Sequence, residues 1–239
     1  MSEIFPVVII NARPAAGKSE IIHALQGIPT MERAERFHIG NLEILDDFPL
    51  LWTWFEEDDL LERVFDRPRL HSTTDGYFIH QDLWHLLIRR LDLDYHKLNR
   101  DLSDSSTVIV EFSRGSSHGG YAQAYQHLSD DLLGLACSLY VKVSFEESLR
   151  KNRARFNPDR PDSILEHGLS DEKMERLYRQ DDWQSFSDGD PNYLHVRDHR
   201  IPYAVFENED DVTSAGGSRL LDRLQESTDQ LWARRIKLG

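Results

Sequence analysis

The chain has 239 residues, a length that suits one α/β domain with an inserted helical part. Its formal net charge of −14 argues against nucleic acid as a partner. Cys137 is the only cysteine, which excludes an internal disulfide and a thiolate metal cluster and favours a reducing compartment. The sequence has neither a signal-like start nor an apolar run of about 18 residues, so we expect a cytoplasmic protein without a membrane partner.

Five apolar runs predict β-strands. Residues 5–11 form a continuous β-branched run, which is typical of a strand buried on both faces of a parallel sheet. Residues 37–45 alternate and predict a weaker second strand. The remaining predicted strands are residues 107–110, 137–143 and 201–207.

Segments with helical spacing of apolar residues separate these strands. The predicted helices are residues 17–26, 49–65, 81–98, 120–135, 144–156, 170–186 and 218–236, with Ser170 as an N-cap. Alternating strands and helices predict a three-layer α/β fold with a central parallel sheet of about five strands. Residues 1–239 form one domain, in which 49–100 are too long for a plain crossover and predict a helical substrate lobe.

Residues 12–19 follow the first strand and read Ala-Arg-Pro-Ala-Ala-Gly-Lys-Ser. They match the phosphate-loop consensus G-x-x-x-x-G-K-[ST] except at Ala12, which replaces the first glycine and is tolerable if its φ is negative. Backbone N–H groups of such a loop bind phosphates, its lysine reaches the terminal phosphates, and its serine can hold Mg²⁺. The residues expected to bind the nucleotide are Arg13, Ala15, Ala16, Gly17, Lys18 and Ser19.

This loop resembles that of P-loop kinases, in particular the nucleoside monophosphate kinase and deoxynucleoside kinase group, whose loops often carry small residues in the middle. The resemblance extends to the strand–loop–helix order over most of the chain, and the loop is its one sharp motif. It implies a P-loop NTPase fold, ATP and Mg²⁺ as cofactors, and phosphate transfer to a small molecule such as a nucleoside or nucleotide.

Carboxylates stand at two predicted strand ends. Glu111 ends the strand at residues 107–110, and the resemblance implies that it supports the metal or a catalytic water while Arg114 contacts the substrate. Asp46 or Asp47, after the second strand, would accept the proton of the acceptor hydroxyl, and the sequence does not choose between them. The alternatives are a strand-end cap for Glu111 and a solvated turn for the two aspartates.

Five cations fall within eleven residues of this acidic chain: Arg150, Lys151, Arg153, Arg155 and Arg160. The cluster resembles the lid of a P-loop kinase and implies a lid over residues 150–170. Arg153 and Arg155 would then act on the transferred phosphoryl group. Arg150 and Arg160 would contact the substrate. The alternatives are a solvated helix paired with its own glutamates and a local nucleic-acid patch.

Asn208 follows the last predicted strand, where related kinases hold adenine, although a turn asparagine has the same appearance. The guanine-reading N-K-x-D motif of GTPases is missing, since Asn208-Glu209-Asp210 lacks the lysine. The eleven histidines show no zinc-binding spacing. The aromatic residues of the helical lobe predict either core packing or stacking on a ring-shaped acceptor.

An ATP- and Mg²⁺-dependent phosphotransferase acting on a small-molecule acceptor is therefore the leading hypothesis, with the catalytic residues Lys18, Asp46 or Asp47, Arg153 and Arg155. Two alternatives stay open. One is a regulatory ATPase or GTPase without a small acceptor, and the other is a kinase of a larger acceptor. The sequence also leaves open whether the chain forms a homodimer.

Overall fold

The computed structural model describes residues 3–155 and 169–238. Its central sheet has six strands in the order β2-β3-β1-β4-β6-β5, of which the first five are mutually parallel and β5 is antiparallel to β6. The strands are β1 Val7–Ala12, β2 Asn41–Asp46, β3 Ser106–Phe112, β4 Ala136–Lys142, β5 Tyr193–Val196 and β6 His199–Glu207. The predicted three-layer α/β fold with a parallel sheet is confirmed.

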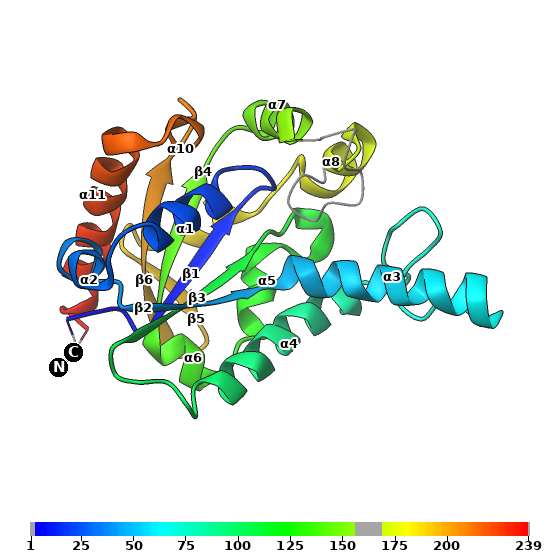
Figure 1. Cartoon of the computed structure of the whole chain (residues 1–239), viewed down its shortest axis with the longest axis horizontal. Helices are drawn as coiled ribbons and strands as arrows, with labels where there is room; N and C mark the ends of the chain where they lie inside the picture. The colour runs from blue at the N-terminus through cyan, green and yellow to red at the C-terminus, as the bar shows by residue number, and fades with distance from the viewer. Residues whose placement is uncertain (1–2, 156–168, 239) are drawn as a thin grey trace.

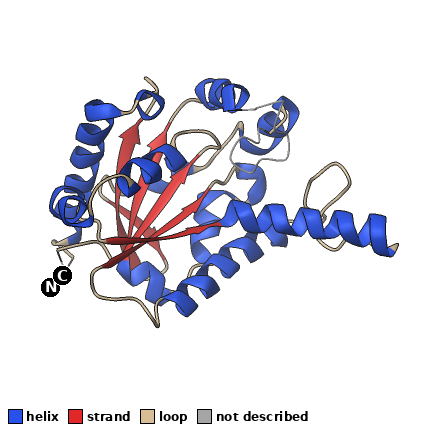
Figure 2. Cartoon of the chain, in the orientation of Figure 1, coloured by secondary structure: helices blue, strands red, loops and turns tan. Residues whose placement is uncertain are grey.

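Helices cover both faces of the sheet (Figure 2). They are α1 Lys18–Gln26, α2 Thr30–Phe37, α3 Asp47–Phe65, α4 Asp82–Leu98, α5 Gly120–Gln126, α6 Asp130–Leu135, α7 Phe145–Arg155, α8 Asp171–Tyr178, α9 Trp183–Ser187, α10 Val212–Ala215 and α11 Gly217–Arg235, with a 3-10 turn η1 at Ser116–His118. Among these described helices, none is long and apolar enough to cross a membrane.

The two cores meet at β1, the strand on which the alternation of side chains is clearest. Val8 and Ile10 pack in the core that contains α1, α2 and α11. Val7 and Ile9 pack in the opposite core, with α4, α5, α6 and α9. Successive side chains of a strand point to opposite faces, so a strand covered on both faces must be apolar throughout. That requirement explains the continuous apolar run of β1.

Several predicted elements differ in extent from the observed ones. The single helix predicted at residues 120–135 is wrong: α5 ends at Gln126, and the Ser129 side chain caps a new helix, α6. The helix predicted at 170–186 is likewise two helices, α8 and α9, although Ser170 does cap α8 by accepting from the N–H of Lys173. The sequence also missed α2 and the short strand β5.

The carboxyl ends of the parallel strands place the candidate site. Asp46 ends β2 and caps α3, since its Oδ1 accepts from the N–H of Phe48 at 2.9 Å. From that point α3 extends away from the body of the molecule, and α7 and α8 lie above the strand ends near the β1–α1 connection (Figure 1). This arrangement brings the phosphate loop, the ends of β2 and β3, and the helices α3 and α8 to one edge of the sheet.

Candidate active site

The phosphate loop joins β1 to α1 in the expected way. Ala12 lies within β1, paired with Val141, and is not among the residues with positive φ, so this position does not need a glycine. Ala15 and Gly17 have φ values of 55° and 114°. A Cβ on Gly17 would lie 2.5 Å from Thr213 Oγ1, which explains the glycine. Alternation of left-handed and right-handed residues turns backbone N–H groups inward and favours anion binding.

Asn208 supports the phosphate loop through hydrogen bonds of its side chain. Its side chain is fully buried, and Nδ2 donates to the carbonyl oxygen of Ala16 at 2.8 Å and to Thr213 Oγ1 at 2.7 Å. Its Oδ1 accepts from the N–H of Thr213 at 3.2 Å. The side-chain groups of Asn208 are therefore committed to Ala16 and Thr213, and the contact of this residue with adenine stays a prediction.

The carboxylates of Asp46, which is half-buried, and Glu111, which is buried, form a pair. They stand opposite each other in the register of β2 and β3, and their side chains hydrogen bond to one another. Burial, followed by the charge of Glu111, raises the pKa of Asp46 to about 7. Glu111 Oε2 is buried without a hydrogen-bond partner among the described residues. At neutral pH this pair therefore holds a proton or requires a cation.

Asp47 has a different partner. Its Oδ2 pairs at 2.5 Å with Nη1 of Arg114, whose side chain is 1% exposed. Arg114 also donates to the carbonyl oxygens of Ser113 at 2.6 Å and Trp84 at 3.1 Å. Burial raises the pKa of Asp47, and the charge of Arg114 opposes that shift. Asp47 and Arg114 are thus occupied with each other, whereas Asp46 forms no ion pair with the described residues and lies beside Glu111.

A cavity of about 160 Å³ connects these groups. Lys18 and Ser19 line it from the phosphate loop, opposite Asp46 and Glu111, and Lys18 Nζ donates to Ser113 Oγ at 2.8 Å. The wall farther from the loop is aromatic. It consists of Phe48, Trp52 and Phe55 from α3, Tyr77 and Phe78 from the following loop, and Trp84 from α4.

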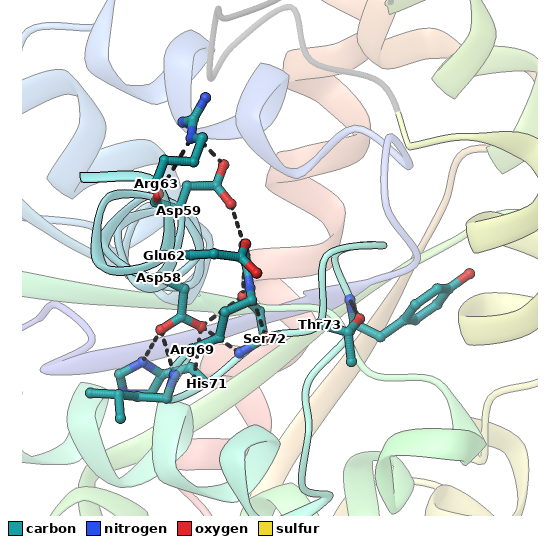
Figure 3. Close-up of polar contacts among 10 residues, drawn as sticks. Asp58, Asp59, Glu62, Arg63, Arg69, His71, Ser72 and Thr73 are labelled. Atoms are coloured by element: carbon teal, nitrogen blue, oxygen red, sulfur yellow. Dashed lines mark hydrogen bonds and ion pairs between the residues drawn. The ribbon is translucent and has the colours of Figure 1, made fainter. Parts of the chain in front are cut away.

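A buried carboxylate fixes the loop between α3 and α4 (Figure 3). Asp58 accepts hydrogen bonds from the N–H groups of Leu70, His71 and Ser72 at 2.8, 2.9 and 2.5 Å, and from the Ser72 hydroxyl at 2.7 Å. Burial alone would raise the pKa of Asp58, but these bonds lower it to about 2. Arg69 adds an ion pair to Asp59 on α3 at 2.5 Å. The loop that carries Tyr77 and Phe78 is therefore anchored to α3.

The predicted lid arginines occupy separate positions. Arg150 pairs with Glu147 and Asp211, and Arg153 pairs with Asp171, in each case at 2.6 Å. Both side chains are more than half exposed and neither lines the cavity in this structure, where each forms ion pairs on the surface, so their contacts with substrate and with the phosphoryl group stay predictions. Arg155 does line the cavity. Arg160 lies outside the described residues.

Arg13 also has a structural position. Its guanidinium donates to the carbonyl oxygens of Tyr178 and Val143, both at 3.2 Å, and pairs with Asp181 at 2.9 Å. These contacts tie the phosphate loop to the segment after α8. The predicted role of Arg13 in nucleotide binding can therefore involve only its backbone.

The site fits a divalent cation with few protein ligands. Two carboxylates lie side by side, Asp46 with a pKa raised to about 7, and Glu111 Oε2 lacks a hydrogen-bond partner among the described residues. No group of three or more histidine, cysteine, aspartate or glutamate side chains in the described part of the chain is arranged to hold a metal. Mg²⁺ commonly keeps several waters and takes one or two carboxylates together with substrate phosphates. Ser19 and Glu111 are the candidate protein ligands.

Sequence reasoning missed Asp58, Ser113 and Lys173 as site residues. Asp58 lies in an acidic run that resembles a solvated helix face, and only the folded loop reveals its partners. Ser113 follows Glu111 by two residues at a strand end, which is a signal that the sequence did contain. Lys173, on α8, reaches the cavity through the tertiary fold.

The pKa of Asp46 predicts the pH dependence of stability in the metal-free protein. Because the folded pKa of about 7 exceeds the unfolded value of about 3.9, the folded state binds the extra proton between them, and unfolding free energy falls as pH rises. Asp46→Asn keeps the cap on α3 but cannot titrate. Urea unfolding in EDTA should show the variant gaining more than about 1 kcal/mol relative to wild type between about pH 5 and about pH 8. A constant difference would contradict the assignment.

Asp58 predicts the opposite pH dependence. Its folded pKa of about 2 lies below the unfolded value, so its stabilisation is present above about pH 4 and is lost as pH falls through about 2. Asp58→Asn should lower the unfolding free energy by about 2 kcal/mol at neutral pH. Thermal unfolding at several pH values should show this gap closing towards about pH 2. The same gap at acidic and neutral pH would show that the carboxylate charge is not what holds the loop.

No protein-family model and no curated protein sequence matches the chain. Among solved structures, it is similar to TT1252 from Thermus thermophilus, with 18% identity over 99% of each chain and a TM-score of 0.44. It is also similar to a sugar kinase from Janibacter sp. HTCC2649, with 12% identity over 96% of this chain and 98% of that one and a TM-score of 0.41. Kti12 from Chaetomium thermophilum, solved with ADP-AlF3, matches with 14% identity over 93% and 99% and a TM-score of 0.45. Similarities at this level do not assign a family.

Proposed function

We propose that this protein is an ATP- and Mg²⁺-dependent phosphotransferase that acts on a small molecule. One observation carries the proposal. A single cavity is lined by the phosphate-loop residues Lys18 and Ser19, by the carboxylates Asp46 and Glu111, and by an aromatic wall on the side away from the loop. A phosphate site and an acceptor site that share one cavity are what direct transfer requires.

We assign each residue of the cavity a role in phosphate transfer from its surroundings. Backbone N–H groups of the loop and Lys18 bind the β- and γ-phosphates of the nucleotide. Ser19 and Glu111 would hold Mg²⁺, which would neutralise charge on the phosphates. Asp46, whose pKa lies near neutrality, accepts the proton of the acceptor hydroxyl as that oxygen attacks the γ-phosphorus. Arg155, which also lines the cavity, is placed to stabilise charge on the transferred group.

The acceptor binds in the part formed by α3, the loop after it and α4, which corresponds to the substrate lobe expected at residues 49–100. The resemblance of the phosphate loop to nucleoside and nucleotide kinases makes ring-containing alcohols the first compounds to examine. A regulatory ATPase would need no such aromatic chamber beside its carboxylate.

The proposal is tested by measuring ADP release with a panel of hydroxylated small molecules, with phosphorylated products identified by mass spectrometry. Lys18→Met should lower kcat by about 10²-fold or more, because it removes a cation from the transferred phosphate. Asp46→Asn should lower kcat by about 10²- to 10⁴-fold and leave the KM for ATP nearly unchanged.

Lys142→Met is the matched control, because Lys142 is exposed, does not line the cavity, and pairs with Glu207 on the neighbouring strand. Full turnover in Lys18→Met would exclude phosphate binding by the loop. ATP turnover that no acceptor stimulates would favour the regulatory ATPase instead.

A further inference from the structure

The aromatic wall of the cavity is fixed before any ligand binds. Tyr77 and Phe78 belong to the loop that Asp58 ties to α3, and the Thr73 backbone N–H donates to the carbonyl oxygen of Tyr77 at 2.7 Å. Phe78 packs edge-on against Trp84, with ring centroids 4.8 Å apart. Rings held in place in this way offer flat faces and edges to a ligand at little entropic cost.

The volume of the cavity is compatible with a ring. A cavity of about 150 Å³ in a protein interior accommodates benzene. The cavity here, of about 160 Å³ and partly open to solvent, has room for an acceptor built on one ring with small substituents. Its floor towards the phosphate loop is polar and its wall is aromatic, so a ring would rest on the wall and direct a hydroxyl towards Asp46.

Lys173 supplies a cation at the rim of this wall. Its Nζ lies 5.4 Å from the centre of the Tyr77 ring and so close to Gly76 that a Cβ there would be 2.6 Å away. Within the described residues its ammonium makes no hydrogen bond or ion pair. Asp75 and Glu172 are the acidic groups that attract it, and both are exposed.

A second cation lies near the same ring but outside the cavity. The exposed guanidinium of Arg176 lies 4.3 Å from the Tyr77 ring, and it borders a separate hollow that Lys173, Asp75 and Glu172 also line. Of these two cations, Lys173 is the one that reaches the acceptor cavity. A half-buried lysine that makes no hydrogen bond or ion pair with the described residues gains from an anionic ligand, because a charge-assisted hydrogen bond replaces lost hydration.

We infer that the acceptor is a single-ring alcohol that carries an acidic group, with its ring on the aromatic wall, its anion at Lys173 and its hydroxyl at Asp46. This inference rests on the proposed function for the role of the hydroxyl, while recognition of the ring and the anion stands on Lys173 and the aromatic wall alone. Lys173 is thus a residue that determines specificity.

The test uses two probes that differ in one charge, 4-(hydroxymethyl)benzoate and its methyl ester. Their binding to the full chain is followed by quenching of tryptophan fluorescence, since Trp52 and Trp84 line the cavity. Wild type should bind the benzoate at least about tenfold more tightly than the ester, as expected for a charge-assisted contact. Lys173→Met should bind both probes equally, Lys173→Arg should keep the preference, and the control Lys142→Met should match wild type.

Equal binding of the two probes to wild type would overturn the inference, as would an unchanged preference in Lys173→Met or failure of both probes to bind at millimolar concentration. Calorimetric binding of MgATP to the same samples separates this outcome from failure of the proposed function. If the protein binds MgATP but shows no preference for the benzoate, the result contradicts only the inferred class of acceptor. If it prefers the benzoate through Lys173 but does not bind MgATP, the result contradicts the proposed phosphotransferase activity.

Discussion

Parallel strands end on the same side of a sheet, and in this protein two of those ends carry carboxylates that face each other in register. Glu111 is buried and Asp46 is half-buried, and the charge of Glu111 adds to burial in raising the pKa of Asp46. A proton on Asp46 or a positive charge nearby stabilises the pair. Lys18, which lines the same cavity, supplies part of that charge, and a divalent cation would supply the rest.

The neighbouring residues depend on this constraint. If Asp47 also faced the cavity as a free carboxylate, three negative charges would crowd one strand end, and Arg114 prevents this by taking Asp47 into a buried ion pair. Arg114 in turn bonds to the backbone of Trp84, which forms part of the aromatic wall. The guanidinium of Arg114 thereby connects the carboxylate end of the cavity to its aromatic wall.

The sequence was sufficient for the fold class and the phosphate loop, because buried parallel strands and a loop between strand and helix leave local patterns. Gly17 and the run at residues 5–11 are such patterns. It was insufficient wherever a side chain has a distant partner. Asn208 bonds to Ala16 far along the chain, and Asp46 and Asp47 are neighbours that differ only in what the fold places beside them.

The arginines of α7 also show that sequence alone does not reveal the distant partners of a side chain. Their clustering in the sequence favoured a lid, but Arg150 and Arg153 pair with acids that come from α7 itself, the α10 cap and α8. A cluster of charged residues in the sequence does not reveal which of their side chains point towards a cavity. Only Arg155 among those described does so, and local spacing did not distinguish it from its neighbours.

The most direct test of the account is a crystal structure of the protein with Mg²⁺, ADP and a planar mimic of the transferred phosphoryl group. The account predicts that the mimic lies within hydrogen-bond distance of Lys18 Nζ. It also predicts that the open face of the mimic, opposite ADP, is turned towards Asp46 and the aromatic cavity. A nucleotide bound away from the phosphate loop, or a mimic whose open face points to bulk solvent, would contradict it.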